Sequence, residues 1–274
     1  MNTSPVTDKL VVRKCRSIDE LRACVNLQQE VWKFEDADVI PLRMFVVAEK
    51  IGGQVIGGFD GDTLVGYALS IPGSRDNHAY LHSHMLAVRE SYRNSGLGKR
   101  LKLAQRQDAL QRGFALIEWT FDPLEIKNAY LNIVKLGVIA RKYSVNHYGY
   151  SSSPLHRGLP TDRLIVEWWL KSKRVTGLLD EGRTPGVNTV EIIPAKKIHV
   201  PAEIYAWRAS AEDLPKAAHV LQRNRQEFIE AFSQGLAVTG YERDAAGNGT
   251  FLLGTWDENP DEYWNVKSKA EETR

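Results

Sequence analysis

Residues 80–101 read YLHSHMLAVRESYRNSGLGKRL, and this stretch decides the fold. Its first part predicts an apolar strand with two histidines, and the rest predicts a basic turn that leads into a helix. In the turn, Arg93, Gly96 and Gly98 stand in the spacing Arg-x-x-Gly-x-Gly. Backbone N–H groups and the helix dipole attract anions at a helix start, and glycines let a ligand approach the backbone closely. The pattern therefore predicts a site for a pyrophosphate group.

Two other phosphate-binding patterns fail on this turn. A P-loop needs Gly-Lys followed by Ser or Thr, but Arg100 follows Lys99 here. The dinucleotide fingerprint needs a third glycine at the position that Leu101 occupies. A strand, turn and helix that merely pack well together remain the other interpretation of the stretch.

The composition predicts a globular protein of one large domain or two smaller ones. The chain has 274 residues, of which 43% are hydrophobic and 26% charged, and its net charge is +2. So small a charge does not point to nucleic acid or to an anionic membrane as a partner. We also find no apolar run of membrane-spanning length and no signal-peptide core. Cys15 and Cys24 are the only cysteines, which is typical of a reducing compartment. We therefore expect a cytoplasmic protein, and the sequence leaves a homo-oligomer open.

The periodicity predicts alternating strands and helices. In chain order we expect a strand at 10–16, helices at 18–32 and 41–50, strands at 55–59, 63–72 and 80–88, a helix at 97–111, a strand at 115–121, a helix at 124–136, and strands at 138–143 and 163–170. Ser17 and Glu20 stand in the spacing of a capping box at the start of the first helix.

This order, together with the glycine turn, resembles the GNAT superfamily of N-acetyltransferases. The motifs that carry the resemblance are FDGD at 59–62, HSHMLAV at 82–88, WTFDP at 119–123, KLG at 135–137 and SPLHRGLPTDRL at 153–164. The resemblance is strong over residues 10–172. It implies an α/β fold with a mixed sheet and the transfer of an acyl group from acyl-CoA to an amine.

The rest of the chain predicts a smaller appendage. We expect the GNAT domain at 8–172, a linker at 173–188, a C-terminal α+β extension at 189–256 and a polar tail at 257–274. Within the extension, residues 189–193 resemble a strand, residues 211–234 a long helix, and residues 236–255 a hairpin.

The resemblance implies that the turn binds the pyrophosphate of CoA and that the preceding strand end pairs with its pantetheine arm. The acyl donor is acetyl-CoA or another acyl-CoA, with succinyl-CoA as an alternative, and no metal is required. The expected cofactor-binding residues are Leu86, Ala87, Val88, Arg93, Asn94, Ser95, Gly96, Leu97, Gly98, Lys99 and Asn128.

His82 and His84 are the first candidates for a general base. They stand two residues apart on a strand, so both rings are expected on one face. An unperturbed imidazole titrates near neutral pH and suits the removal of a proton from an amine. The alternatives are a structural pair, or half of a zinc site that lacks its other ligands. Glu118, on the next strand, is a second candidate base, or else a solvated acid.

The general acid is harder to assign. The tyrosine that usually protonates the leaving thiolate in the superfamily would lie at residue 133, where this chain has Ile133. Tyr143 is the catalytic candidate among the nearby substitutes, which also include Tyr130, His147 and Tyr148. A structural role is the alternative for each of them.

The loop at 148–163 corresponds to a flap over the acceptor in the superfamily. Its candidate acceptor-binding residues are His156, Arg157 and Arg163. Arginine binds carboxylates with two parallel hydrogen bonds, so the loop favours a small carboxylated amine such as an amino acid. A rigid hairpin without a binding role is the alternative. Two other functions stay open, namely an acyl-CoA sensor without turnover and an acyltransferase that acts on a protein or an antibiotic.

Overall fold

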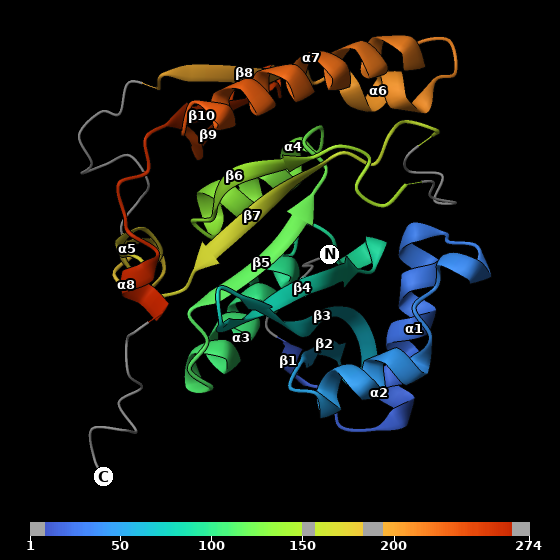
Figure 1. The fold of residues 1–274 in the computed structure, drawn as a ribbon. Helices are drawn as coiled ribbons and strands as arrows, with labels where there is room; N and C mark the ends of the chain where they lie inside the picture. Colours follow the sequence, from blue (N-terminus) through green and yellow to red (C-terminus); the bar gives the residue numbers. More distant parts are fainter. Residues whose placement is uncertain (1–8, 150–156, 183–193, 265–274) are drawn as a thin grey trace, which may run out of the picture. The chain divides into compact units, whose positions relative to one another are not determined.

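The computed structural model describes residues 9–149, 157–182 and 194–264. These residues fall into two compact units, drawn in Figure 1. Unit 1 comprises residues 9–117 with residue 264, and unit 2 comprises residues 118–149, 157–182 and 194–263. The expected strand at 189–193 and the expected residue His156 lie outside the described residues.

Unit 1 is an antiparallel sheet with helices on both faces. Its strands follow the order β1 (Leu10–Lys14), β2 (Gln54–Asp60), β3 (Thr63–Arg75) and β4 (His78–Val88). Its helices are α1 (Ile18–Trp32), α2 (Leu42–Lys50) and α3 (Leu97–Gln111), with short 3-10 turns η2 (Asp36–Asp38) and η3 (Glu90–Tyr92). The expected elements of this part are confirmed, and the bounds of α1 and α3 match the prediction.

The start of α1 follows from its cap. The Ser17 hydroxyl accepts a hydrogen bond from the N–H of Glu20 (3.2 Å), as a capping box requires. The Glu20 carboxylate bonds the N–H of Arg16 (2.6 Å), one residue before the cap. The Ser17 hydroxyl thereby satisfies an N–H donor that the helix start leaves open.

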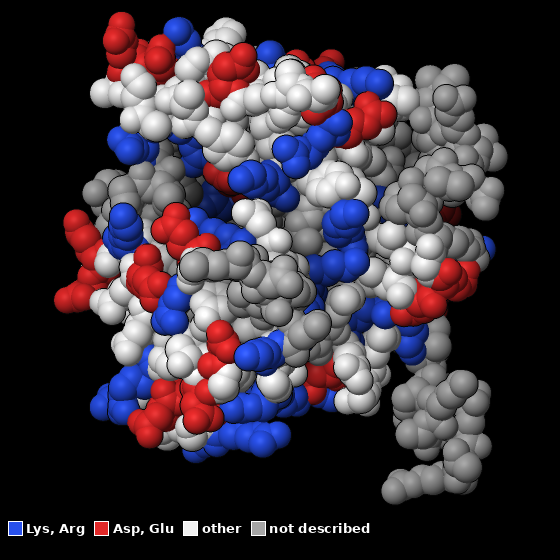
Figure 2. Space-filling model, turned by 180° about the vertical axis from the view of Figure 1, so that it is seen from behind, with Lys and Arg blue, Asp and Glu red and all other residues white. Residues whose placement is uncertain are grey.

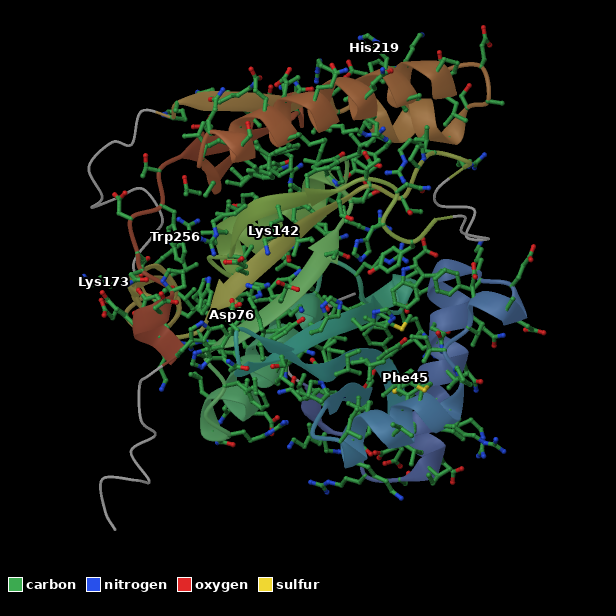
Figure 3. All side chains as sticks on the ribbon, viewed as in Figure 1. Phe45, Asp76, Lys142, Lys173, His219 and Trp256 are labelled. Carbon is green, nitrogen blue, oxygen red and sulfur yellow. The ribbon has the colours of Figure 1, made fainter. Side chains whose placement is uncertain are left out.

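Side chains that alternate along the strands of unit 1 pack into two separate hydrophobic cores, one on each face of the sheet. One core lies under α1 and α2 and includes Phe45, Tyr67 and Leu69, whereas the other lies under α3 and includes Ile56 and Leu101. Figure 2 shows charged side chains of both signs interspersed on the face that it presents. Phe45, labelled in Figure 3, is fully buried, and its ring meets that of Tyr67 edge to face at 5.7 Å.

Unit 2 begins within β5 and contains the C-terminal strands. Its strands follow the order β5 (Leu116–Phe121), β7 (Arg163–Trp169), β6 (Ile139–Ser144), β9 (Ala237–Arg243), β10 (Gly249–Gly254) and β8 (Lys196–Val200). Its helices are α4 (Ile126–Ala129), the π-helical η4 (Tyr130–Lys135), α5 (Lys173–Leu179), α6 (Ile204–Ala209), α7 (Leu214–Ser233) and α8 (Asp261–Trp264). Because β9 pairs with β6 at Ala140 and Val238, the C-terminal hairpin continues the sheet of this unit.

Three parts of unit 2 differ from the sequence prediction. The helix expected at 124–136 is a single α-helical turn, α4, that continues as the π-helical η4. The segment expected as a linker begins with α5, which Ser172 caps by accepting from the N–H of Val175. Strand β8 and helix α6 were not predicted. Of the helices in the described parts of the chain, none has the length and apolar character needed to cross a membrane.

Candidate active site

Strand β4 carries an extra residue at His84. Leu69 of β3 lies opposite Met85, but the next residue, Ser70, lies opposite Ser83, so the register skips His84. Such a bulge bends a strand and re-aims its side chains. The rings of His82 and His84 lie 6.1 Å apart between centroids, and both residues are partly exposed. The structure thus brings the two predicted bases together at a bulge.

The bulge also places Ser83 and Met85 on opposite faces of the sheet. Ser83 faces α3, because its hydroxyl oxygen accepts a hydrogen bond from the Lys102 ammonium group (2.7 Å). Met85 faces the opposite core, because its sulfur accepts one from the Tyr67 hydroxyl (3.4 Å). Residues two apart on a regular strand would share a face. The alternation of buried and half-buried residues along 80–88 continues through the bulge, so the sequence pattern did not reveal it.

The turn after β4 has the backbone of an anion-binding loop. Asn94 and Gly96 both adopt left-handed φ angles, of 64° and 81°, with Ser95 between them. The Ser95 hydroxyl donates to the carbonyl of Tyr92 (2.7 Å) and fixes the turn. Helix α3 begins at Leu97, whose N–H donates to the Ser95 hydroxyl (3.4 Å), and the next N–H groups of the first turn have no partner within the helix. Gly98 has an ordinary helical backbone, and only Gly96 needs the freedom of a glycine here.

Some of the cationic side chains around the turn are bound to protein groups, and others are available to a ligand. Arg89 is paired with Glu30 (3.1 Å), and Arg100 donates to the carbonyl of Leu10 (2.6 Å). Among the residues that the structure describes, neither Arg93 nor Lys99 has an ion-pair partner, and the first turn of α3 holds no acidic residue. The turn thus offers N–H groups and two cations together, which fits a pyrophosphate.

The strand end at 86–88 leads into this turn. Leu86 lies opposite Ala68 of β3 and Val88 lies opposite Gly66, so both stay within the sheet. Ala87 is buried, whereas Leu86 and Val88 are half-buried and pack beside the core under α3. This part of the expected cofactor-binding set therefore forms one continuous piece with the turn.

The predicted residues of unit 2 begin with Glu118, which is buried in β5 (8% exposed). Two residues further on the same strand, the Thr120 hydroxyl lies 3.0 Å from the hydroxyl of Tyr148. Tyr148 belongs to the loop between β6 and β7. The loop that was predicted to cover the acceptor therefore contacts the strand that carries Glu118.

Asn128 lies exposed on α4, just before the π-helical turn. Its side-chain oxygen is 3.4 Å from the side-chain nitrogen of Asn132. Ile133, at the position of the usual tyrosine, is buried (1% exposed) within η4. A single π-helical turn often occurs at functional sites, and no periodicity in the sequence announces it.

Tyr143 is held by protein groups. Its hydroxyl donates to the carboxylate of Asp162 (2.7 Å), and its ring stacks on that of Phe228 at 5.6 Å. Burial, followed by the hydrogen bond to Asp162, raises the pKa of the phenol well above its ordinary value. Such a phenol is a poor proton donor, so this geometry does not favour Tyr143 as the general acid.

The two described arginines of the acceptor loop differ. Arg157 is exposed and has a left-handed φ of 50°, immediately before Gly158. Arg163 is buried (9% exposed), donates to the carbonyl of Asp162 (2.8 Å) and lies 5.2 Å from the centroid of the Tyr148 ring. Arg157 is therefore the one that a ligand can reach, whereas Arg163 packs within the base of the loop.

Two features of the site region were missed in the sequence. One is the buried Lys102, which looks like an ordinary surface lysine on a helix. The other is Arg225 of α7, which forms a bidentate ion pair with Asp162 at 2.8 and 3.0 Å. No local spacing connects residues so far apart in the chain, so only the fold could show this pair. Within 9–149, 157–182 and 194–264, no three His, Cys, Asp or Glu side chains are grouped as a metal site.

Comparison with known proteins points to one family. Residues 19–128 match the model of the acetyltransferase (GNAT) family. Among solved structures, the ribosomal-protein-S18-alanine N-acetyltransferase from Escherichia coli is similar at 15% identity, over 60% of this chain and 95% of that chain, with a TM-score of 0.48. The putative acetyltransferase yncA from Salmonella typhimurium, solved with acetyl-CoA, is 14% identical over 60% and 96% of the two chains, with a TM-score of 0.49.

An aminoglycoside acetyltransferase from an uncultured soil metagenomic sample is 14% identical, over 46% of this chain and 87% of that chain, with a TM-score of 0.42. No curated protein sequence matches the chain. The match of residues 19–128 to the acetyltransferase (GNAT) family model confirms the predicted superfamily, fold class and type of enzyme.

Proposed function

We propose that the protein is an acyl-CoA-dependent N-acyltransferase whose acceptor is the amine of a small carboxylated molecule, such as an amino acid. The acyl group is acetyl or another short group, with succinyl as an alternative. The observation that carries the proposal is the arrangement within unit 1, where a histidine pair at a bulge and an anion-binding turn belong to one continuous strand and turn.

The turn would hold the pyrophosphate of the donor. Arg93 and Lys99 supply the charge, and the N–H groups at the start of α3 supply hydrogen bonds. Gly96 keeps the backbone in the left-handed conformation that opens these groups. The thioester of the bound donor supplies the acyl group, and its chemistry needs no metal.

The chain's own residues would prepare the acceptor. An amine is nucleophilic only after it loses its proton, and a neutral imidazole of His82 or His84 can accept that proton directly or through a water molecule. Glu118 is the alternative base. We assign no side chain as the general acid, because Ile133 is apolar and the Tyr143 phenol is bonded to Asp162.

The acceptor's carboxylate would meet Arg157. This residue is exposed on the acceptor loop, and a guanidinium recognises a carboxylate through two parallel hydrogen bonds. Arg163 is bound to protein groups and takes a structural part in the loop instead. A protein or antibiotic amine as acceptor would not require Arg157.

A sensor without turnover is the second candidate, and one observation favours it. Neither the usual tyrosine position, Ile133, nor the bonded Tyr143 offers a ready proton donor to the leaving group. A pure binder, however, has no need of the histidine pair. Turnover therefore decides between the two functions.

The test is the release of free CoA thiol from acetyl-CoA and from succinyl-CoA, with L- and D-amino acids and their decarboxylated amines as paired acceptors. We expect release that depends on the acceptor and that favours the carboxylated member of a pair. Arg157→Met should remove that preference, and Arg22→Met, an exposed arginine on α1, is its control. Binding of CoA without release for any acceptor would support the sensor. Equal release from both members of each pair would contradict a carboxylated acceptor.

A further inference from the structure

The carboxylate of Asp162, the residue just before β7, is fully buried and surrounded by donors. Its side chain is 0% exposed. It accepts hydrogen bonds from the Tyr143 hydroxyl (2.7 Å) and from the N–H of Asn146 (2.9 Å). Arg225 adds two more, from Nε at 2.8 Å and from Nη2 at 3.0 Å. A buried carboxylate is tolerated only with such partners, so Arg225 supplies the charge that keeps Asp162 in place.

Asp162 and its neighbour Thr161 join the two legs of the acceptor loop. The N–H of His147 donates to the carbonyl of Thr161 (2.9 Å), and the N–H of Tyr148 donates to the Thr161 hydroxyl (3.0 Å). In return, the N–H of Thr161 donates to the side chain of Asn146 (3.2 Å). The first leg of the loop, at 145–149, is therefore fixed by the position of residues 161 and 162.

The segment at 145–149 also contacts β5, the strand that carries the candidate general base Glu118. The Tyr148 hydroxyl lies 3.0 Å from the Thr120 hydroxyl on β5, two residues after Glu118. The guanidinium carbon of Arg163 lies over the Tyr148 ring, 5.2 Å from its centroid. A shift of Asp162 would therefore displace Tyr148 from β5.

The ion pair between Arg225 and Asp162 depends on the C-terminal segment, which supplies Arg225. Arg225 stands on α7, and Phe228, one turn further along, stacks on Tyr143 at 5.6 Å and meets Phe251 of β10 at 5.1 Å. The apolar contacts fix the helix, and the fixed helix presents its guanidinium to Asp162. The Arg225 side chain is 27% exposed, so solvent screens the pair only in part.

We propose that Arg225 is a positioning residue that fixes the acceptor loop through Asp162, and that the C-terminal segment at 196–254 thereby takes part in acceptor selection. The proposal rests on the proposed function, because it takes the loop as the acceptor's binding element. The C-terminal segment is then part of the acyltransferase unit and not a separate docking module.

The experiment compares Arg225→Met and Arg225→Lys with the wild type in two measurements. The first is amide hydrogen exchange, resolved to residues 145–149. We expect Arg225→Met to speed exchange at 146–148 by at least about tenfold, and the lysine variant, which keeps the charge but loses the bidentate geometry, to fall between. The second is the KM for the best acceptor, which should rise at least about fivefold while the KM for acetyl-CoA stays within about twofold.

Two variants of the same segment control for general destabilisation. Lys216→Met removes an exposed ion pair with Asp213 on the same helix. Arg208→Met removes a buried arginine that is paired with Asp122 (3.1 Å) and Glu125 (2.9 Å), whereas the ion-pair partner of Asp162 is Arg225. Neither should speed exchange at 146–148. Should Arg225→Met fail to fold, the graded effect of Arg225→Lys carries the test.

Unchanged exchange at 146–148 in both Arg225 variants would overturn the proposal. So would faster exchange that leaves the acceptor KM unchanged or raises the KM for acetyl-CoA instead. The exchange measurement needs no turnover. A wild type that releases no CoA would therefore overturn the proposed function and the acceptor role together, whereas normal release with unchanged exchange would overturn only the role of Arg225.

Discussion

The ammonium nitrogen of Lys102 lies 2.7 Å from the hydroxyl oxygen of Ser83, and both residues are buried, at 2% and 5% exposure. The contact extends into a polar chain, because Gln105 bonds both Ser83 (3.1 Å) and Ser70 (2.6 Å). Ser83 directly precedes the bulge residue His84. The chain of polar groups therefore ties β4 to α3 at the point where the strand changes face.

Lys102→Met should stabilise the protein at neutral pH. Burial lowers the pKa of the Lys102 ammonium well below its ordinary value of 10.5. Between the lowered pKa and 10.5 the unfolded chain binds the proton and the folded chain does not, so wild-type stability rises with pH. The advantage of the methionine variant should therefore shrink as the pH rises from the lowered pKa toward 10.5, by at most about 1.4 kcal/mol per pH unit.

The measurement is urea unfolding of both proteins at several pH values, with Lys50→Met on the surface of α2 as the control for residue type. A stability difference between Lys102→Met and wild type that stays constant at every pH up to 10.5 would contradict a lowered pKa of Lys102.

Gly96→Ala should weaken CoA binding, and Gly113→Ala should not. Both glycines have a φ of 81°, nothing lies within 4 Å of a Cβ added to either, and they stand at opposite ends of α3. An alanine in this left-handed conformation costs about 1–2 kcal/mol at either position. Only at Gly96 would the relief of that strain also turn the N–H groups that we propose as the pyrophosphate site.

Calorimetric titration with CoA separates the two effects. We expect the melting temperature to fall similarly in both variants, and the Kd for CoA to rise at least about tenfold in Gly96→Ala alone. An equal change of Kd in the two variants would show that the turn acts only through the stability of the helix.

The ends of α1 and α3 could be read from the sequence because local chemistry sets them. Ser17 caps the first helix, and Gly96 and Gly113 bound the other with left-handed residues. The π-helical turn at 130–135 and the short strand β8 could not be read in this way. A π-turn has no periodicity of its own over so few residues, and β8 is defined only by pairing with β10.

In the candidate site, too, features set by local sequence were predictable, and features set by contacts between distant residues were not. The turn at 93–99 was predicted because backbone conformation and charge are local properties. The bulge at His84 depends on the register between β3 and β4. The ion pair on Asp162 depends on Arg225, which lies 63 positions further along the chain. Tyr143 illustrates the consequence, because its hydroxyl suggested an acid until the fold placed it against Asp162.

Gly249→Ala should destabilise unit 2 by about 1–3 kcal/mol. A Cβ at this position would collide with the hydroxyl oxygen and the Cζ atom of Tyr241, whose side chain is buried. In the described part of the chain that hydroxyl has no hydrogen-bond partner. Tyr241→Phe alone should therefore change stability little, since it removes a polar group that is buried without a bond.

Thermal unfolding of the two single variants and the double variant forms the test. Part of the loss in Gly249→Ala should return in the double variant, because the colliding oxygen is gone. Strictly additive effects would show that the two residues do not interact.

The most direct test of the central claim is the rate of acceptor-dependent CoA release in His82→Ala, His84→Ala and His78→Ala, measured with saturating acyl-CoA and the best acceptor. All three residues belong to β4, but His78 stacks on Trp264 at 4.8 Å, outside the pair at the bulge. The account predicts that kcat falls at least about 100-fold in one or both variants of the pair and stays within about threefold in His78→Ala. Wild-type kcat in both variants of the pair, together with a loss of kcat in Glu118→Gln, would contradict it and assign the base to β5.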